Sequence, residues 1–167
     1  MTDKNQPTAI RGFEAALPIA LLRARSATAH KFKPHTDAAG LTQPQWRIMR
    51  ALAPGTPLDS RTLALRCALL PPSVSRIVRV LLDRGLIQRH DAPDGRSQRL
   101  SLTSEGRALF DKVALLSEAV YRDIENAFGR ERLLELLNHL HALTELCETL
   151  PDLPLPETPS ALEETQE

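Results

Sequence analysis

The 167-residue chain is poor in cysteine, in aromatic residues and in long apolar runs. Its two cysteines, Cys67 and Cys147, lie far apart, without Cys-x-x-Cys spacing and without clustered histidines. The sequence therefore predicts neither a disulfide framework nor a zinc site, and we expect both thiols to be reduced and buried. A redox-sensitive Cys67 is the alternative. With 4% aromatic residues, the core must consist mainly of aliphatic side chains.

Signals for membrane insertion and for catalysis are also missing. No stretch approaches the roughly 20 apolar residues that cross a bilayer, and residues 1–8 are polar with no apolar signal segment behind them. We therefore expect a cytoplasmic protein without membrane contact. The sequence holds no nucleophile elbow, phosphate-binding loop, metal-ligand spacing or pair of catalytic acids, which argues against an enzyme and against a metal or other cofactor.

What is present is typical of a folded globular chain, with 42% apolar and 25% charged residues. The length suits one domain with tails. We expect a flexible N-terminus over residues 1–9, one folded domain over residues 10–150 and a disordered tail over residues 151–167. The tail holds four prolines and five acidic residues without a base, and such a composition does not build a packed core.

The formal net charge of zero conceals an uneven distribution along the chain. Residues 61–107 carry nine arginines against four acids, whereas residues 108–150 carry eight acids against four bases. The arginine side chain offers a fixed fork of donors that suits phosphates and guanine edges better than lysine does. Residues 61–107 therefore favour a surface that faces a polyanion. An ordinary solvated arginine surface is the alternative.

Apolar periodicity predicts six helices, and a change of period predicts one hairpin. The predicted helices cover residues 13–33, 42–53, 60–68, 71–85, 103–129 and 130–150. Pro34 ends the first helix, Thr42 and Gln45 have capping-box spacing at the start of the second, and Thr103 caps the fifth. Two short extended segments, residues 86–90 and 99–102, flank a tight turn over residues 92–96.

The order helix, tight turn, helix, hairpin predicts a mainly α winged helix-turn-helix with a DNA-binding lobe over about residues 55–105. The fourth helix separates into two faces at 100° per residue. Its apolar face would pack against the domain and carries Val74, Ile77, Val78, Leu81 and Leu82. Its other face presents Ser75, Arg76 and Arg79, which suit the major groove of DNA. Ser73 lies near the helix start, where it can meet a phosphate.

The hairpin carries a second candidate DNA contact. Asp94, Arg96 and Arg99 have the spacing D-x-R-x-x-R, in which Asp94 can aim the Arg96 guanidinium into the narrow minor groove. Arg99 lies on the returning strand, where it fixes the hairpin or touches a phosphate. The alternative for Asp94 and Arg96 is a surface ion pair of little energetic worth.

The terminal helices, over about residues 10–38 and 106–150, have apolar stripes too wide for packing against one small domain. We expect them to join two copies into a homodimer that reads a palindrome with half-sites about one turn apart. The candidate interface residues are Leu17, Leu21, Leu136, Leu140, Leu143 and Cys147. A closed core within one chain is the alternative.

Arg25 is the leading candidate for ligand contact. It falls beside Leu21 and Phe32 on the packing side of the first helix, where no acid is an obvious neighbour. We expect a half-buried arginine that can receive a ligand carboxylate.

Six motifs together resemble the MarR family of winged-helix repressors over residues 10–150. They are Gly40-Leu41-Thr42-Gln43-Pro44-Gln45-Trp46, Leu63-Ala64, Pro72-Ser73-Val74-Ser75-Arg76, Asp83-Arg84-Gly85-Leu86-Ile87, Asp94-Gly95-Arg96-Ser97-Gln98-Arg99 and Leu102-Thr103. Residues 20–25, 45–47 and 128–129 are similar to the branch that represses homoprotocatechuate and related aromatic-acid degradation. The double proline at 71–72 and the acidic tail depart from that branch.

The resemblance implies a dimeric repressor of an aromatic-catabolic operon, bound to double-stranded DNA at a palindromic operator and released by a small aromatic acid, phenol or thioester. Family pockets lie between the first two helices and the DNA-binding lobe, which adds Ser26, His30, Trp46 and Arg50 as candidate effector contacts. Trp46 can instead be core, His30 an interface residue and Arg50 a surface or phosphate contact. The alternative function is a winged-helix adaptor that binds an acidic protein partner and has no sequence-specific DNA binding.

Overall fold

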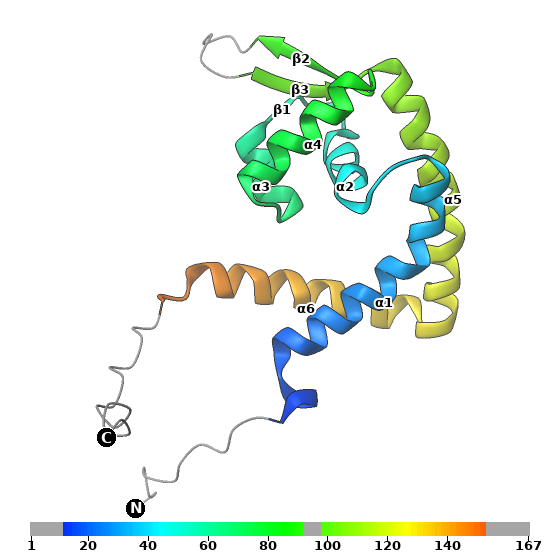
Figure 1. The fold of residues 1–167 in the computed structure, drawn as a ribbon. Coiled ribbons are helices and arrows are strands. Elements are labelled where there is room, and N and C mark those ends of the chain that lie inside the picture. Colours follow the sequence, from blue (N-terminus) through cyan, green and yellow to red (C-terminus); the bar gives the residue numbers. More distant parts are fainter. Residues whose placement is uncertain (1–11, 92–97, 153–167) are drawn as a thin grey trace, which may run out of the picture. The chain divides into compact units, whose positions relative to one another are not determined.

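The structure is a computed structural model that describes residues 12–91 and 98–152 (Figure 1). Its elements are the 3-10 turn η1 (Phe13–Ala15), α1 (Leu17–Ala38), α2 (Gln43–Leu52), β1 (Leu58–Asp59), α3 (Ser60–Cys67), α4 (Pro71–Asp83), β2 (Ile87–Asp91), β3 (Gln98–Leu102), α5 (Ser104–Phe128) and α6 (Arg130–Thr149). The chain forms two compact units, which meet within α5 between Asp123 and Ile124. Among the described helices, none is long and apolar enough to cross a membrane.

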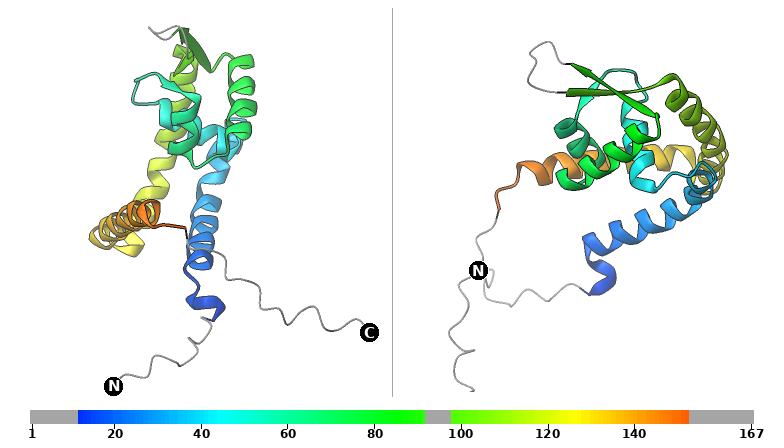
Figure 2. Two further views of the ribbon diagram at one scale, coloured as in Figure 1. Left: turned by 90° about the vertical axis from the view of Figure 1, so that its left-hand side faces the viewer. Right: turned by 45° about the horizontal axis from the view of Figure 1, so that its top comes forward.

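The predicted mainly α winged helix-turn-helix is confirmed, and the first unit contains it. Figures 1 and 2 show α2, α3 and α4 gathered beneath the strands. The three strands are antiparallel in the order β1-β3-β2, with Leu58 opposite Leu100 and His90 opposite Arg99. The sequence predicts only the two hairpin strands, because two residues are too few for β1 to show an alternating pattern.

The core of the first unit is mainly aliphatic, as the composition predicts. Its largest fully buried apolar side chains come from α2, α3, α4 and α5, and they are Ile48, Met49, Leu52, Leu63, Leu81, Val74 and Val113. In α4, Val74, Val78 and Leu81 are buried and Ile77 and Leu82 are half-buried. The apolar face predicted for this helix is therefore the face that it packs, and its opposite face remains exposed.

The predicted cap of α2 is present. The Thr42 side chain accepts a hydrogen bond from the Gln45 backbone N–H, and the Gln45 side chain accepts one from the Thr42 backbone N–H. This reciprocal pair satisfies two of the backbone donors that a helix start leaves free. It fixes the first turn of the helix that carries Trp46 and Arg50.

The prediction that Pro34 ends the first helix is wrong. Helix α1 continues past Pro34 to Ala38. A proline removes one N–H donor but does not prevent the following turn from staying helical when packing holds that turn. Thr36 provides this packing: it is buried, and its Oγ1 donates to the carbonyl oxygen of Lys33 at 2.9 Å. The chain turns instead at Gly40, whose φ of 62° glycine adopts readily.

The junction between the DNA-binding lobe and α5 is tight. The Thr103 hydroxyl donates to the Gly85 carbonyl at 2.7 Å and accepts the Gly106 N–H at 2.9 Å, which confirms Thr103 as the cap. A Cβ at Gly106 would lie 1.8 Å from the Leu86 carbonyl oxygen. Only glycine lets α5 approach the backbone at this distance, so the direction in which α5 leaves the lobe is fixed.

The second unit holds the end of α5 and α6, with Gly129 between them. The Arg132 guanidinium lies 4.5 Å from the centre of the Phe128 ring, a cation–π contact that joins the two helices. None of the residues of α6 is buried. A leucine-rich helix that buries nothing in one copy has an apolar surface left to cover.

We predict that Asp59 stabilises the fold as the N-terminal cap of α3, and only when it is ionised. Its carboxylate accepts hydrogen bonds from the Thr62 N–H at 2.8 Å and from the Thr62 hydroxyl at 3.0 Å. The bond from the Thr62 backbone is the main cause that lowers the pKa of Asp59 below its ordinary value. Replacing Asp59 by alanine should lower the free energy of unfolding by about 1 kcal/mol near neutral pH.

The sign of the pH dependence follows from the lowered pKa. The contribution of Asp59 is complete above its unfolded pKa of about 3.9 and is lost as the pH falls through the lower folded value. Urea unfolding of the parent and Asp59→Ala proteins at about pH 7 and about pH 2 measures both differences. A difference in stability that stays constant at acid pH would contradict this role for the carboxylate.

Candidate nucleic-acid interface and ligand site

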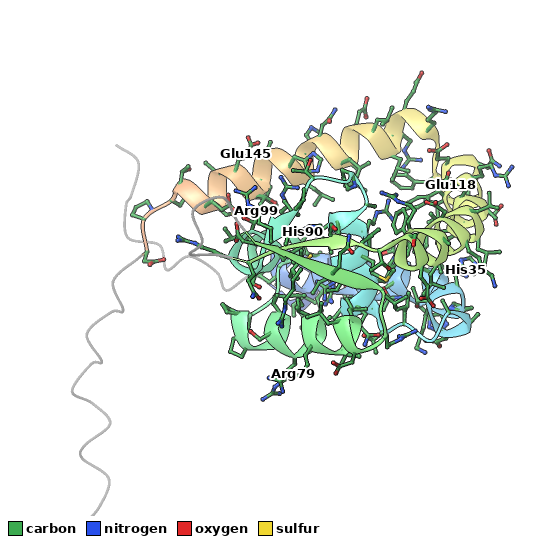
Figure 3. All side chains as sticks on the ribbon, turned by 90° about the horizontal axis from the view of Figure 1, so that it is seen from above. His35, Arg79, His90, Arg99, Glu118 and Glu145 are labelled. Atoms are coloured by element: carbon green, nitrogen blue, oxygen red, sulfur yellow. The ribbon has the colours of Figure 1, made fainter. Side chains whose placement is uncertain are left out.

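The exposed face of α4 carries the residues predicted to read DNA. Ser75, Arg76 and Arg79 are all exposed, and Ser73 is half-buried at the helix start. Figure 3 shows Arg79 extending from α4 away from the body of the molecule. The Ser75 hydroxyl donates back to the Pro71 carbonyl at 3.2 Å, which orients it within the first turn.

The arginines of this face have no carboxylate partner in the part of the chain that the structure describes. The four ion pairs found there involve neither Arg76 nor Arg79. A guanidinium that is exposed and unpaired keeps all its donors for an external acceptor. The α4 face therefore offers positive charge and hydrogen-bond donors to an external polyanion.

The wing contributes Arg99 to the same lobe. Arg99 is exposed on β3, near His90 of β2 (Figure 3). In the sheet register it lies opposite His90 on β2 and opposite Asp59 on β1. The His90 Nε2 lies 2.7 Å from the Ser101 hydroxyl, a contact that ties the two hairpin strands together. Asp94 and Arg96, the predicted minor-groove pair, lie outside the described residues.

Two arginines of residues 61–107 serve the fold, which corrects the view of that segment as one surface facing a polyanion. Arg84 donates to the Gly40 carbonyl at 2.7 Å, and Arg107 donates to the Ala53 carbonyl. Counting charges along the sequence does not distinguish these structural arginines from the exposed Arg79. Their hydrogen bonds to distant backbone carbonyls do so. Arg61, exposed on α3 beside Gln98 of the wing, is a candidate phosphate contact that the sequence analysis did not single out.

Trp46, one of the candidate effector residues, is core. It is 6% exposed and stacks on Phe110 of α5, with ring centres 4.9 Å apart. The Arg107 guanidinium lies over the Phe110 ring, 5.7 Å from its centre. Trp46 therefore joins α2 to α5 and leaves little of its own surface for a ligand.

Arg50 has a partner that the sequence analysis missed. Its Nη1 donates to the Tyr121 hydroxyl at 3.0 Å, and its guanidinium lies 5.6 Å from the Tyr121 ring centre. The Tyr121 ring in turn lies 4.8 Å from the Phe32 ring. Side chains of α1, α2 and α5 thus meet in one cluster, here called the Arg50 cluster: Phe32, Arg50 and Tyr121. The sequence signal that could have pointed to this residue is that Tyr121 is its single tyrosine.

The three candidates on α1, Arg25, Ser26 and His30, are exposed. The expectation of a half-buried Arg25 is therefore wrong for a single copy. The periodicity places Arg25 on the packing side, but nothing in one described chain covers that stretch of α1. Thr36 is the one buried residue of α1.

The candidate dimer residues are largely uncovered. Leu17 is 45% exposed, Leu21 39% and Leu136 42%, while Leu140 and Leu143 are half-buried. Cys147 is also exposed, contrary to the expectation that both thiols are buried. The exposed leucines leave apolar surface uncovered on each of the two described units.

A three-helix lobe with an outward arginine face on its third helix and a β-hairpin wing defines a winged-helix DNA-binding protein. The sequence profile of the MarR family matches residues 39–97. The homoprotocatechuate degradative operon repressor of Escherichia coli is 37% identical over 132 residues, which cover 78% of this chain and 89% of the repressor. The chain belongs to the MarR family and is a transcriptional repressor of the winged-helix type.

Two further relatives agree with this assignment. The HTH-type transcriptional regulator FarR of Neisseria gonorrhoeae is 36% identical over 137 residues, which cover 81% of this chain and 94% of FarR. The crystal structure of NadR in complex with 4-hydroxyphenylacetate superimposes with a TM-score of 0.73 at 35% identity and covers 83% of this chain and 97% of NadR. These relatives are regulators of transcription and not enzymes.

We predict that Cys67 is chemically inert in the folded protein. Its thiol is 4% exposed and donates to the Arg47 carbonyl at 3.5 Å. Burial raises the pKa of Cys67, and the charge of Arg47 opposes that shift only in part. In a Cys147→Ser protein, a disulfide reagent should modify Cys67 at least about a hundredfold more slowly than free cysteine until urea unfolds the chain. Modification of the native protein at the rate of free cysteine would instead support a redox-sensitive site.

Proposed function

We propose that two copies of this repressor bind a palindromic operator of an aromatic-catabolic operon, and that a small aromatic acid, phenol or thioester releases them. The observation that carries the proposal is the exposed face of α4, where Arg76 and Arg79 have no carboxylate partner among residues 12–91 and 98–152. The buried face of the same helix holds this face in place. Such a repressor acts in the cytoplasm, where its operator lies.

In this proposal α4 enters the major groove. Its 13 residues span about 20 Å, enough to lie in one groove. Arg79 and Arg76 donate to guanine edges or phosphates, Ser75 contacts a base edge, and Ser73 meets a phosphate at the helix start. The wing follows the backbone, with Arg99 on a phosphate and Arg96, aimed by Asp94, in the adjacent minor groove.

Pairing of the terminal helices supplies the second reading helix. The exposed Leu17, Leu21 and Leu136 support this step, as does the absence of buried residues in α6. Leu140, Leu143 and Cys147 continue the apolar stripe of α6. Two copies related by a twofold axis place two α4 helices about one helical turn apart, so the operator is a palindrome.

We place the effector on the Arg50 cluster. A guanidinium beside a phenol and a second aromatic ring suits an aromatic acid, because the carboxylate can pair with Arg50 while its ring stacks on Phe32 or Tyr121. Arg25, Ser26 and His30 are exposed on α1 and would complete the site from the helix that also pairs the copies. One relative is named for homoprotocatechuate and another was solved with 4-hydroxyphenylacetate, and both compounds are aromatic acids.

The effector acts by linkage and requires no chemistry. It binds more tightly to a form of the dimer in which the two α4 helices have the wrong spacing. The effector then lowers DNA affinity by the same factor by which DNA lowers effector affinity. Arg50 lies on α2, which also contributes Ile48 and Met49 to the core beside α4. A ligand on the Arg50 cluster therefore acts on a helix that supports the reading helix.

We predict that Arg79 reads a base. The test selects a preferred duplex from a random library and measures its affinity and that of a random duplex. Arg79→Ala should cost roughly 1 to 3 kcal/mol on the preferred duplex and relax the preference at particular base pairs. Arg122→Ala, a change of an exposed arginine on α5, is the matched control and should leave both affinities unchanged. Equal losses on both duplexes would make Arg79 a phosphate contact.

We predict that the Arg50 cluster receives the effector carboxylate. With 4-hydroxyphenylacetate as the probe, Arg50→Met should weaken ligand binding about tenfold or more in calorimetry, and more ligand should be needed to release the operator. Tyr121→Phe removes the hydroxyl beside Arg50, and Arg122→Met on the same helix is the control. If Arg50→Met and the parent protein bind the probe equally well, the effector site lies elsewhere.

A further inference from the structure

An exposed apolar patch lies where α3 meets α4, two helices that pack side by side in the lobe (Figure 1). Leu65 of α3 is 75% exposed, and Leu70, just before α4, is 74% exposed. Pro71 and Pro72, the first two residues of α4, are exposed as well. These four residues are here called the Leu70 patch. Nothing in the described chain covers them.

Leu70 breaks a local rule of helix formation. It is the N-cap residue of α4, a position at which Ser, Thr, Asp and Asn are preferred, and its side chain makes no capping hydrogen bond. A leucine at this position stabilises the helix less than a serine would, and it exposes a large apolar side chain to water. A residue that breaks a local rule without a compensating contact in the fold points to a role outside the fold.

The double proline at residues 71–72, a departure from the branch that the sequence resembles, leaves the start of α4 poor in hydrogen-bond donors. A proline has no backbone N–H. The next two backbone N–H groups, those of Ser73 and Val74, donate to the Leu70 carbonyl oxygen at 2.9 and 3.1 Å. The backbone of residues 71–74 therefore offers no free donor to a phosphate, and the first turn presents an apolar surface instead.

The surroundings of the Leu70 patch are positively charged. Residues 60–82 contain no acid and four arginines, all of which are exposed: Arg61, Arg66, Arg76 and Arg79. None of the four forms an ion pair within residues 12–91 and 98–152. A purely apolar partner would leave these guanidinium groups without an acceptor, whereas a polyanion supplies one. The patch therefore suits a polyanion that also exposes apolar groups.

The Leu70 patch is continuous with the α4 face that the proposed function places in the major groove. Ser75 belongs to that face, and it lines one hollow together with Leu65, Leu70 and Pro71. The N-terminal residues of a reading helix are the ones that contact base edges. The apolar group that base edges offer in the major groove is the 5-methyl group of thymine. Double-stranded DNA thus combines the negative charge and the apolar group that this surface requires.

We propose that the Leu70 patch reads thymine. The side chains of Leu70 and Pro71 pack against 5-methyl groups of thymines in each half-site of the operator. This inference rests on the proposed function and adds a base preference that the arginines of α4 do not supply, because a guanidinium selects guanine or phosphate.

The test replaces thymine by deoxyuridine, which lacks only the methyl group, one position at a time in the preferred duplex of the full-length protein. At the contacted position, replacement in both half-sites should weaken binding of the parent protein about tenfold, as expected when two methyl groups lose their apolar contact. Leu70→Ala should bind the thymine duplex about tenfold more weakly, and deoxyuridine should then cost less than about twofold.

Two further variants separate base reading from other effects. Leu115→Ala removes an equally exposed leucine, 75% exposed on α5, and should respond to deoxyuridine as the parent does. Leu70→Ser supplies the missing capping side chain, so it should unfold at a higher temperature than the parent and still lose the response to deoxyuridine. A loss of binding in this variant is therefore not a loss of folding.

The inference is overturned if deoxyuridine at every thymine leaves the affinity of the parent unchanged. It is also overturned if Leu70→Ala keeps the full response, because the methyl group then acts through DNA shape and not through the patch. In both cases the proposed function survives as long as Arg79→Ala relaxes the base preference. If no duplex binds better than random DNA, the proposed function falls as well, and the patch serves a partner other than DNA.

Discussion

The packing of one side of α4 is the constraint on which the rest of the molecule depends. Val74, Val78 and Leu81 are buried in the mainly aliphatic core, and returning any of them to water would cost about 1.5 to 3 kcal/mol. This cost fixes the rotation of the helix about its axis. Because Arg76 and Arg79 lie on the opposite side, they must face outward, and the reading surface follows from the core.

The two terminal helices, in contrast to α4, have no face that is fully buried within the described chain. α1 buries only Thr36 and α6 buries nothing, so the terminal helices keep apolar surface that one copy does not cover. The DNA-binding lobe therefore has a core of its own, whereas the described terminal helices bury little within one copy. Helix α2 contributes to both the core and the Arg50 cluster. Its Ile48 and Met49 are buried in the core, and its Arg50 bonds to Tyr121 of α5.

Sequence reasoning succeeds where the determinant is local. The Thr42 cap, the faces of α4 and the junction at Thr103 depend on residues a few positions apart, and spacing reveals them. It fails where the determinant is tertiary. Pro34 stays helical because of packing around Thr36, and Tyr121 gains its contacts from helices far away in the sequence. The exposure of Arg25 could not be foreseen, because the periodicity marks a packing face without saying which chain covers it.

The most direct measurement of the central claim is guanine N7 methylation protection on the preferred duplex. N7 faces the major groove, so an inserted α4 should shield it. The account predicts two protected segments whose centres lie about 10 base pairs apart, one for each copy. Full methylation of the guanines in a duplex that the protein demonstrably binds, or one protected segment without a symmetry mate, would contradict a paired reading of the major groove by α4.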